Sequence, residues 1–303
     1  MSGRTTDSET APFQTSLASF GTEAIQSTGP TKTVPTAKIP SGLTIHEQDL
    51  DTLLGRGGHA RRPTDLVLAP VAIHRRTLKH RFVCANEPRD TLRLTGPVDV
   101  AFELVTATND SDPEILDRVD RIPLLEQLLQ ENPDARNPFR QVLGKAPATA
   151  VNEVEQARTR IETVTGYHPR RVSAIREWGD PRQSTEAADI ADQLEGTLAI
   201  EEHLREETEH ATSKESLVRR ATRNLVESDG RAWRERYPSI ERLWLCGLST
   251  LSVTMTDFIA AILATTDVEV HLHTRHASGP LHANGLPGRF DVEQPGAEVY
   301  TDR

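Results

Sequence analysis

The chain has 303 residues and a formal net charge of −10, with 35 Lys and Arg against 45 Asp and Glu. This length allows two domains with sizeable cores, and the acidic balance argues against general binding of polyanions through bulk charge, although a local basic patch is compatible with it. Two cysteines far apart, no signal peptide and no apolar run of membrane-spanning length favour a cytoplasmic protein with no membrane contact.

The basic residues are mostly arginine, because only five of the 35 are lysine. Together with frequent Asp, Glu and Thr, this usage is typical of an acidic proteome from a GC-rich genome or a salt-rich cytoplasm. We state this as a hypothesis about the source. High salt would weaken any contact between the protein and phosphate.

The N-terminal third begins with residues 1–42, which are rich in Ser, Thr and Pro, and we expect a disordered tail there. Residues 43–110 are expected to form the first part of an α/β core. The apolar pattern in this part predicts two strands, at 65–70 and 92–94, and two helices, at 71–82 and 98–106.

The middle of the chain, residues 111–236, reads as a helical subdomain. Asp112-Pro113-Glu114 is typical of a helix start, with Pro at the first helical position. A later helix is expected to end at Gly166, another covers 190–204, and a fourth is capped by Ser213.

Residues 237–275 are expected to complete the core, because they read as a strand, a helix capped by Ser252 and a second strand. Such units build parallel sheets by right-handed crossover. The predicted fold class is therefore α/β, a parallel sheet core interrupted by a helical subdomain. Residues 276–303 have the composition of a loose C-terminal tail.

The order of these elements resembles the N-terminal helicase-like part of AddB-type subunits of bacterial helicase-nucleases, and more distantly the UvrD-like superfamily 1 helicases. Gly247, Ser252 and Val253 stand where that family has the turn after a strand and the start of the following helix. The resemblance covers roughly 65–272 and implies a core like that of P-loop NTPases. It also implies a role in DNA repair or recombination.

The departures from that family are as informative as the matches. The sequence has no GxxxxGK[ST] motif, and its glycine-rich stretch 54–59 lacks both the spacing and the lysine of a phosphate-binding loop. Cys246 stands where a magnesium-binding acid is expected, and no stretch supplies the carboxylates and lysine of a nuclease site. We expect a degenerate, truncated member with no catalytic residue, cofactor or metal, and no ATP turnover by this chain alone.

A basic cluster on the helix after the first of these strands is the main candidate for function. Arg75, Arg76, Lys79 and Arg81 fall within about two helical turns, and Arg61 and Arg62 precede the strand. The resemblance implies that this region corresponds to the segment of superfamily 1 helicases that touches single-stranded DNA. The alternative is a solvated helix face, which charge runs usually are.

Histidine and cysteine offer weaker candidates. His271 and His273 alternate along a strand, with His276 and His282 following, a pattern that transition metals can use. No carboxylate or thiolate sits at ligand spacing, so half-exposed histidines at a strand end are the favoured interpretation. Cys246 reads as a buried structural thiol.

The sequence therefore predicts a non-catalytic helicase-like component of DNA repair or recombination. It would bind single-stranded DNA weakly through the basic residues above, or dock on a helicase-nuclease partner subunit. The alternative is an interaction or regulatory α/β protein, or a decayed fragment, with no nucleic-acid contact.

Overall fold

The structure is a computed structural model. It describes residues 40–47, 50–69, 72–107, 114–144, 146–179, 185–208, 211–248, 251–274, 290 and 292–300. Nearly all of the expected disordered tail lies outside these residues.

The central feature is a sheet of five strands in the order β1-β5-β4-β2-β3, with every neighbouring pair parallel. The strands are β1 (Leu43–Glu47), β2 (Asp65–Leu68), β3 (Leu92–Thr95), β4 (Arg242–Leu248) and β5 (Glu269–Thr274). The predicted α/β class with a P-loop-like parallel core is confirmed.

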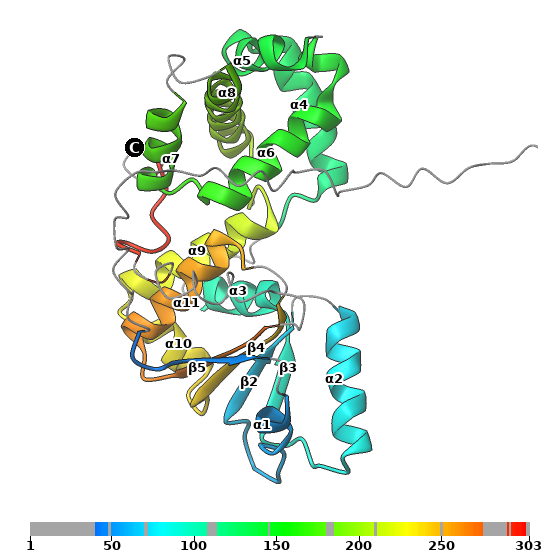
Figure 1. Cartoon of the computed structure of the whole chain (residues 1–303), viewed down its shortest axis with the longest axis vertical. Helices are drawn as coiled ribbons and strands as arrows, with labels where there is room; N and C mark the ends of the chain where they lie inside the picture. The colour runs from blue at the N-terminus through cyan, green and yellow to red at the C-terminus, as the bar shows by residue number, and fades with distance from the viewer. Residues whose placement is uncertain are drawn as a thin grey trace, which may run out of the picture. The chain divides into compact units, whose positions relative to one another are not determined.

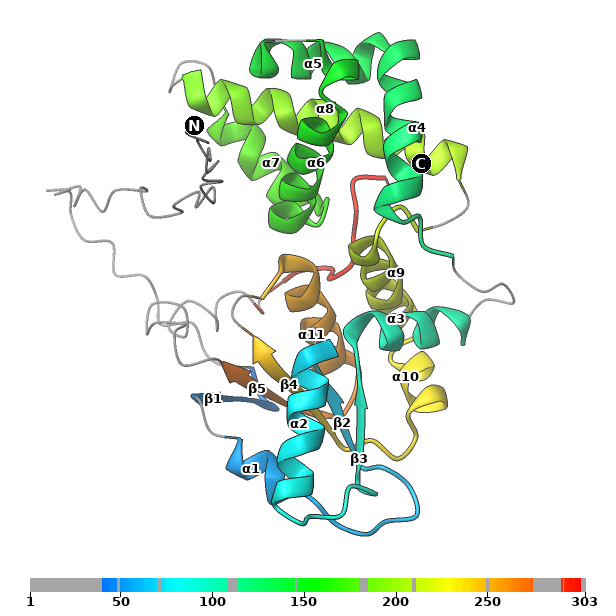
Figure 2. The same cartoon turned by 90° about the vertical axis from the view of Figure 1, so that its right-hand side faces the viewer.

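Helices cover both faces of this sheet, as Figures 1 and 2 show. One face carries α1 (Asp51–Leu54) and α2 (Ala72–Cys84). The other carries α3 (Pro97–Thr106), α9 (Lys214–Glu227), α10 (Arg231–Arg236) and α11 (Val253–Thr265). Because side chains alternate along a strand, Leu243 and Leu245 pack toward the second group, whereas Trp244 packs toward α2.

The helical interruption between β3 and β4 includes a group of five helices with an apolar core of its own. They are α4 (Arg118–Glu131), α5 (Pro133–Leu143), α6 (Val151–Thr165), α7 (Pro169–Trp178) and α8 (Thr185–Glu207), shown in green in Figure 1. Leu125, Phe139, Val154 and Ile200 are buried together between α4, α5, α6 and α8. In the described part of the chain, no helix has both the length and the apolar character needed to cross a membrane.

Local signals in the sequence place several helix ends correctly. The Ser252 hydroxyl accepts a hydrogen bond from the Met255 amide at 3.2 Å, and Ser213 accepts one from Ser216 at 2.9 Å, as expected for helix caps. Gly166 ends α6 with φ of 54°, a conformation that glycine adopts without steric cost.

The predicted helix start at Asp112-Pro113-Glu114 is wrong for Glu114, and the first two residues lie outside the described part. α4 begins only at Arg118. Ala211 donates to the Glu114 carbonyl at 2.8 Å and accepts from the Leu116 amide at 2.9 Å, so this stretch is held as a bridge to a distant segment. Tertiary pairing has overridden the local signal.

The C-terminal stretch 292–300 differs from the loose tail that its composition predicts. Glu298 is only 3 % exposed, the Val299 amide donates to the Tyr167 carbonyl at 3.0 Å, and the Tyr300 hydroxyl donates to the Leu198 carbonyl at 3.0 Å. Polar contacts with α8 and α9, which periodicity does not reveal, hold this segment in place.

Candidate nucleic-acid interface

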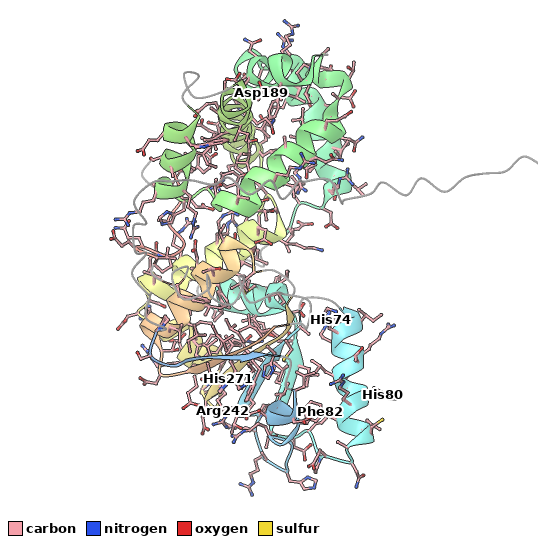
Figure 3. The ribbon with its side chains drawn as sticks, in the orientation of Figure 1. His74, His80, Phe82, Asp189, Arg242 and His271 are labelled. Atoms are coloured by element: carbon pink, nitrogen blue, oxygen red, sulfur yellow. The ribbon has the colours of Figure 1, made fainter. Side chains whose placement is uncertain are left out.

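Helix α2 is attached to the sheet by a narrow apolar stripe. Leu78 and Phe82, one turn apart, are 3 % and 0 % exposed and pack against Val67 and Trp244. Phe82 therefore faces the core. Figure 3 labels His74, His80 and Phe82 along this helix. Because the buried stripe is narrow, most of the surface of α2 is left to solvent.

The predicted cationic residues of α2 differ in what surrounds them. Arg76, Lys79 and Arg81 are exposed, whereas Arg75 is partly buried. Residues on a helix are about 100° apart, so Arg76 and Lys79 point outward within about 60° of each other, and Arg75 and Arg81 flank the apolar stripe on opposite sides.

Arg75 is paired with a carboxylate of the protein itself. Its Nη1 donates to Oδ2 of Asp99 at 3.1 Å, and the same carboxylate accepts from the Gly96 amide at 2.9 Å at the start of α3. A neutralised guanidinium releases fewer counterions on meeting a phosphate. Arg76, Lys79 and Arg81 are therefore the stronger candidates.

Arg61 and Arg62 are exposed in the loop between α1 and β2. This loop enters the amino end of β2, whereas α2 starts at the carboxyl end of that strand. Arg61 and Arg62 therefore lie toward the opposite end of β2 from the start of α2, near which Arg75 and Arg76 lie. The six candidates do not form one compact patch.

A groove beside α2 extends the candidate interface in a way that the sequence does not indicate. It has a volume of about 690 Å³ and lies between the C-terminal half of α2, the following loop and the edge strand β3. Lys79 and Arg89 contribute positive charge, Glu87 and Asp90 contribute negative charge, and Val83 contributes apolar surface. Arg89 lies in the loop between α2 and the edge strand β3, and it lines the groove because β3 pairs with β2. No local pattern in the sequence indicates this position.

The glycine-rich stretch that follows α1 is committed to internal hydrogen bonds. The Gly55 amide donates to the Asp51 carbonyl at 2.8 Å, Gly57 donates to Leu54 at 3.0 Å, and Gly58 donates to Pro88 at 2.8 Å. A phosphate-binding loop needs such amides directed at its ligand. Here the amides of Gly55 and Gly57 bond to carbonyls of α1, and the amide of Gly58 connects this loop to the loop after α2.

The carboxyl edge of the sheet has the topology at which open α/β sheets bind ligands. The chain moves from β2 to β3 toward one edge with α2 on one face, and from β4 to β5 toward the other edge with α11 on the opposite face. β2 and β4 are neighbours, so their carboxyl ends flank the switch point.

A side chain of the protein itself packs into this switch point. Gly247 at the end of β4 has φ of 76°, and a Cβ there would lie 2.6 Å from Nδ1 of His74 on α2. That buried nitrogen has no hydrogen-bond partner among the described residues. Cys246, next to Gly247, is 2 % exposed, and burial raises the pKa of its thiol to about 12, in agreement with the predicted structural role.

The predicted histidine pair lies on one face of β5, as its alternation indicates. His271 stacks on Trp244 with ring centroids 4.0 Å apart, and His46 of β1 stacks on His273 at 4.4 Å. His273 is 2 % exposed, so the expectation of half-exposed histidines is wrong for it, because it is buried with these stacked rings. His276 and His282 lie outside the described residues.

These histidines have no arrangement suited to a metal. Among the residues that the structure describes, no three His, Cys, Asp or Glu side chains are placed to hold a metal ion. Burial and the neighbouring His46 lower the pKa of His271, which favours its neutral ring. The cluster therefore packs as an aromatic layer.

The amino ends of β2 and β4 are joined by Asp65. Its carboxylate accepts from Nε of Arg242 at 2.7 Å and from Nε1 of Trp244 at 2.8 Å. Burial opposes ionisation of Asp65, but the bonds from Arg242 and Thr64 outweigh it and lower the pKa. Figure 3 labels Arg242 and His271 on the sheet. The bonds made by Asp65 hold β2 and β4 together under α2, which packs on Val67 and Trp244.

The parallel sheet, the helical interruption and the solvent-facing helix after β2 define an α/β protein with a P-loop-like core. Residues 30–301 match the family described as halobacterial UvrD-like protein, and the chain belongs to this family. It is thus a helicase-like protein. A comparison with curated proteins gave no match.

Proposed function

We propose that the chain is a non-catalytic, AddB-like component of DNA repair or recombination that binds single-stranded DNA along α2 and works in the cytoplasm with a helicase-nuclease partner. One observation carries this proposal. Arg76, Lys79 and Arg81 are exposed on a helix that uses only a narrow stripe for packing, in a member of a UvrD-like family. Long cationic side chains with this freedom are suited to phosphate contacts.

The groove beside α2 supports a non-specific mode of binding. Lys79 and Arg89 provide positive charge along a path between α2 and β3. Among the described residues that line it, Phe82 is the one Phe, Tyr or Trp, and it is buried. With no exposed ring of that kind for base stacking, affinity should come from the backbone phosphates and depend strongly on salt.

The test is fluorescence anisotropy of a labelled single-stranded oligonucleotide over the salt range in which circular dichroism shows the chain folded. We expect log Kd to rise linearly with log salt. In Arg76→Ala/Lys79→Ala/Arg81→Ala, the slope should fall by about two, since each phosphate contact on a single strand contributes about 0.7.

The matched control is Arg160→Ala/Lys214→Ala/Arg231→Ala, which removes three exposed cations from α6, α9 and α10. It should retain the wild-type slope. Absence of binding at the lowest salt that keeps the protein folded would contradict the proposal, and so would an equal loss in both triple variants.

A second candidate function, docking of α2 on a partner subunit, is favoured by two apolar side chains. Ile73 is 64 % exposed and Val83 is 65 % exposed on the same helix. Large apolar residues that share a face with cations are typical of contact surfaces. If docking is the function, Ile73→Ser should weaken binding to a P-loop-bearing helicase-nuclease subunit at least tenfold while leaving any DNA affinity unchanged.

A further inference from the structure

The C-terminal stretch 292–300 inserts a carboxylate into a pocket of arginines. Arg205 donates from Nη2 to Oε1 of Glu298 at 3.1 Å and from Nη1 to Oε2 at 2.9 Å. Arg223 donates to Oε2 at 2.8 Å, and Nε of Arg219 donates to Oε1. Three guanidinium groups from α8 and α9 thus surround one carboxylate.

The pocket is interior and preformed. Arg219 and Glu298 are 1 % and 3 % exposed. The guanidinium of Arg219 is fixed further by Glu162, which accepts from Nη1 at 2.9 Å, and by the ring of Tyr167, whose centroid lies 4.9 Å away. Arg205 is fixed by Glu201 of its own helix. Arg219 and Arg205 therefore have partners besides Glu298 that help to fix their positions.

The described ion pairs around Glu298 form one network, and the partly buried Glu215 also interacts with Arg219. The surrounding network joins five arginines to four glutamates: Arg121, Arg158, Arg205, Arg219 and Arg223 with Glu155, Glu162, Glu201 and Glu298. Nη2 of Arg219 and Nε of Arg223 are buried and have no hydrogen-bond partner among the described residues.

Burial and the charge of Arg205 lower the pKa of the neighbouring Arg220, whereas the charge of Glu298 raises it. Buried N–H donors without a partner favour an additional anionic acceptor.

We propose that this pocket is a binding site for small oxyanions and that Glu298 is its internal ligand. The residues that would hold the anion are Arg205, Arg219 and Arg223, in the positions in which they now hold the carboxylate. Since α6 and α8 belong to the helical group and α9 packs on the sheet, the occupied pocket also joins these two parts of the fold.

The test is rescue of Glu298→Ala by small anions. This substitution removes a fragment equivalent to acetate, so potassium acetate can replace what is lost. Thermal unfolding would be followed in acetate, phosphate and chloride at matched ionic strength. We expect Glu298→Ala to gain about 3 °C or more in acetate over chloride, with saturation, and phosphate to act at lower concentration because of its second charge.

Two controls separate binding from general salt effects. Phosphate stabilises folded proteins because it is excluded from their surface. The rise in melting temperature of wild type and of Glu293→Ala in phosphate measures this general effect. Glu293 lies in the same segment, but its side chain is exposed and is described in contact with Arg170 and not with the pocket. In Glu298→Gln the amide still fills the pocket, so this variant should show no saturable gain.

The proposal is overturned if Glu298→Ala gains no more from acetate or phosphate than wild type does, or if Glu298→Gln is rescued equally. If Glu298→Ala does not fold in chloride, the yield of refolding in acetate against chloride replaces the melting temperature. An equal yield in the two salts overturns the proposal in the same way.

Discussion

Helix α2 and the arginine network around Glu298 use the same residue type in opposite ways. On α2 the cations Arg76, Lys79 and Arg81 extend into solvent, whereas Arg158 and Arg219 are each 1 % exposed and bound by glutamates. Desolvating a guanidinium costs several kcal/mol, so a buried arginine is stable only with partners in place. Arginines in the interior therefore act in folding, whereas Arg76 and Arg81 on α2 are exposed to solvent.

Among the substitutions that test this contrast, Arg158→Ala is expected to have the largest effect on the free energy of unfolding. Arg158 contacts Glu155 at 2.8 Å, Glu162 at 3.3 Å and Glu201 at 3.0 Å. Its removal leaves three buried carboxylates short of a partner, and we expect a loss of about 3–5 kcal/mol in the free energy of unfolding. Urea unfolding measures this loss.

The control for Arg158→Ala lies two residues away on the same helix. Arg160 is exposed, so Arg160→Ala should change the free energy of unfolding by no more than about 0.5 kcal/mol. If both substitutions had equal effects, the contrast between interior and surface arginines would not hold.

An intermediate effect is expected from acid. Burial opposes ionisation of Glu298, but Arg219 and Arg205 outweigh it and lower its pKa to about 2. A carboxyl with a lowered pKa in the folded state stabilises the fold above its unfolded value, near 4.5, and that stability is lost as the pH falls toward 2. This group accounts for roughly 3 kcal/mol over that window.

The measurement is urea unfolding of wild type and Glu298→Gln between pH 5 and pH 2. Wild type should be the more stable at pH 5, and its advantage should shrink steadily as the pH is lowered. A difference that stays constant across this range would show that Glu298 titrates alike in the folded and unfolded chain.

The smallest effect on stability is expected on α2. Arg76→Ala/Lys79→Ala/Arg81→Ala should change the free energy of unfolding by less than about 0.5 kcal/mol for each substitution, because no buried partner loses its counter-charge. Thermal unfolding, read beside the anisotropy experiment, checks this. A loss of several kcal/mol would mean that these cations hold the fold together.

Local patterns in the sequence were sufficient to predict many of the strands and helices of the α/β core. The strand at β4, the cap at Ser252 and the helix α11 follow from apolar spacing and cap chemistry, because these signals lie within a few residues of one another. β1 was missed, since Leu43 and Ile45 alternate with polar residues at a sheet edge and form too short a pattern.

The candidate site was predictable only in part. The cations of α2 could be found from composition, but the pairing of Arg75 with Asp99 joins residues 24 positions apart. The contact between His74 and Gly247 depends on β2 lying beside β4, and Glu298 lies 79 positions from Arg219. Such contacts are set by topology, which no single stretch encodes.

The pairing of β1 with β5 has a consequence for synthesis of the protein. His46 and His271, joined by a 3.0 Å hydrogen bond across these strands, are 225 positions apart. At translation rates of about 5–20 residues per second, the first strand waits roughly 10–45 s on the ribosome before its neighbour is made. Until then β1 has no neighbouring strand of this sheet beside it, so the nascent chain depends on protection from aggregation during this interval.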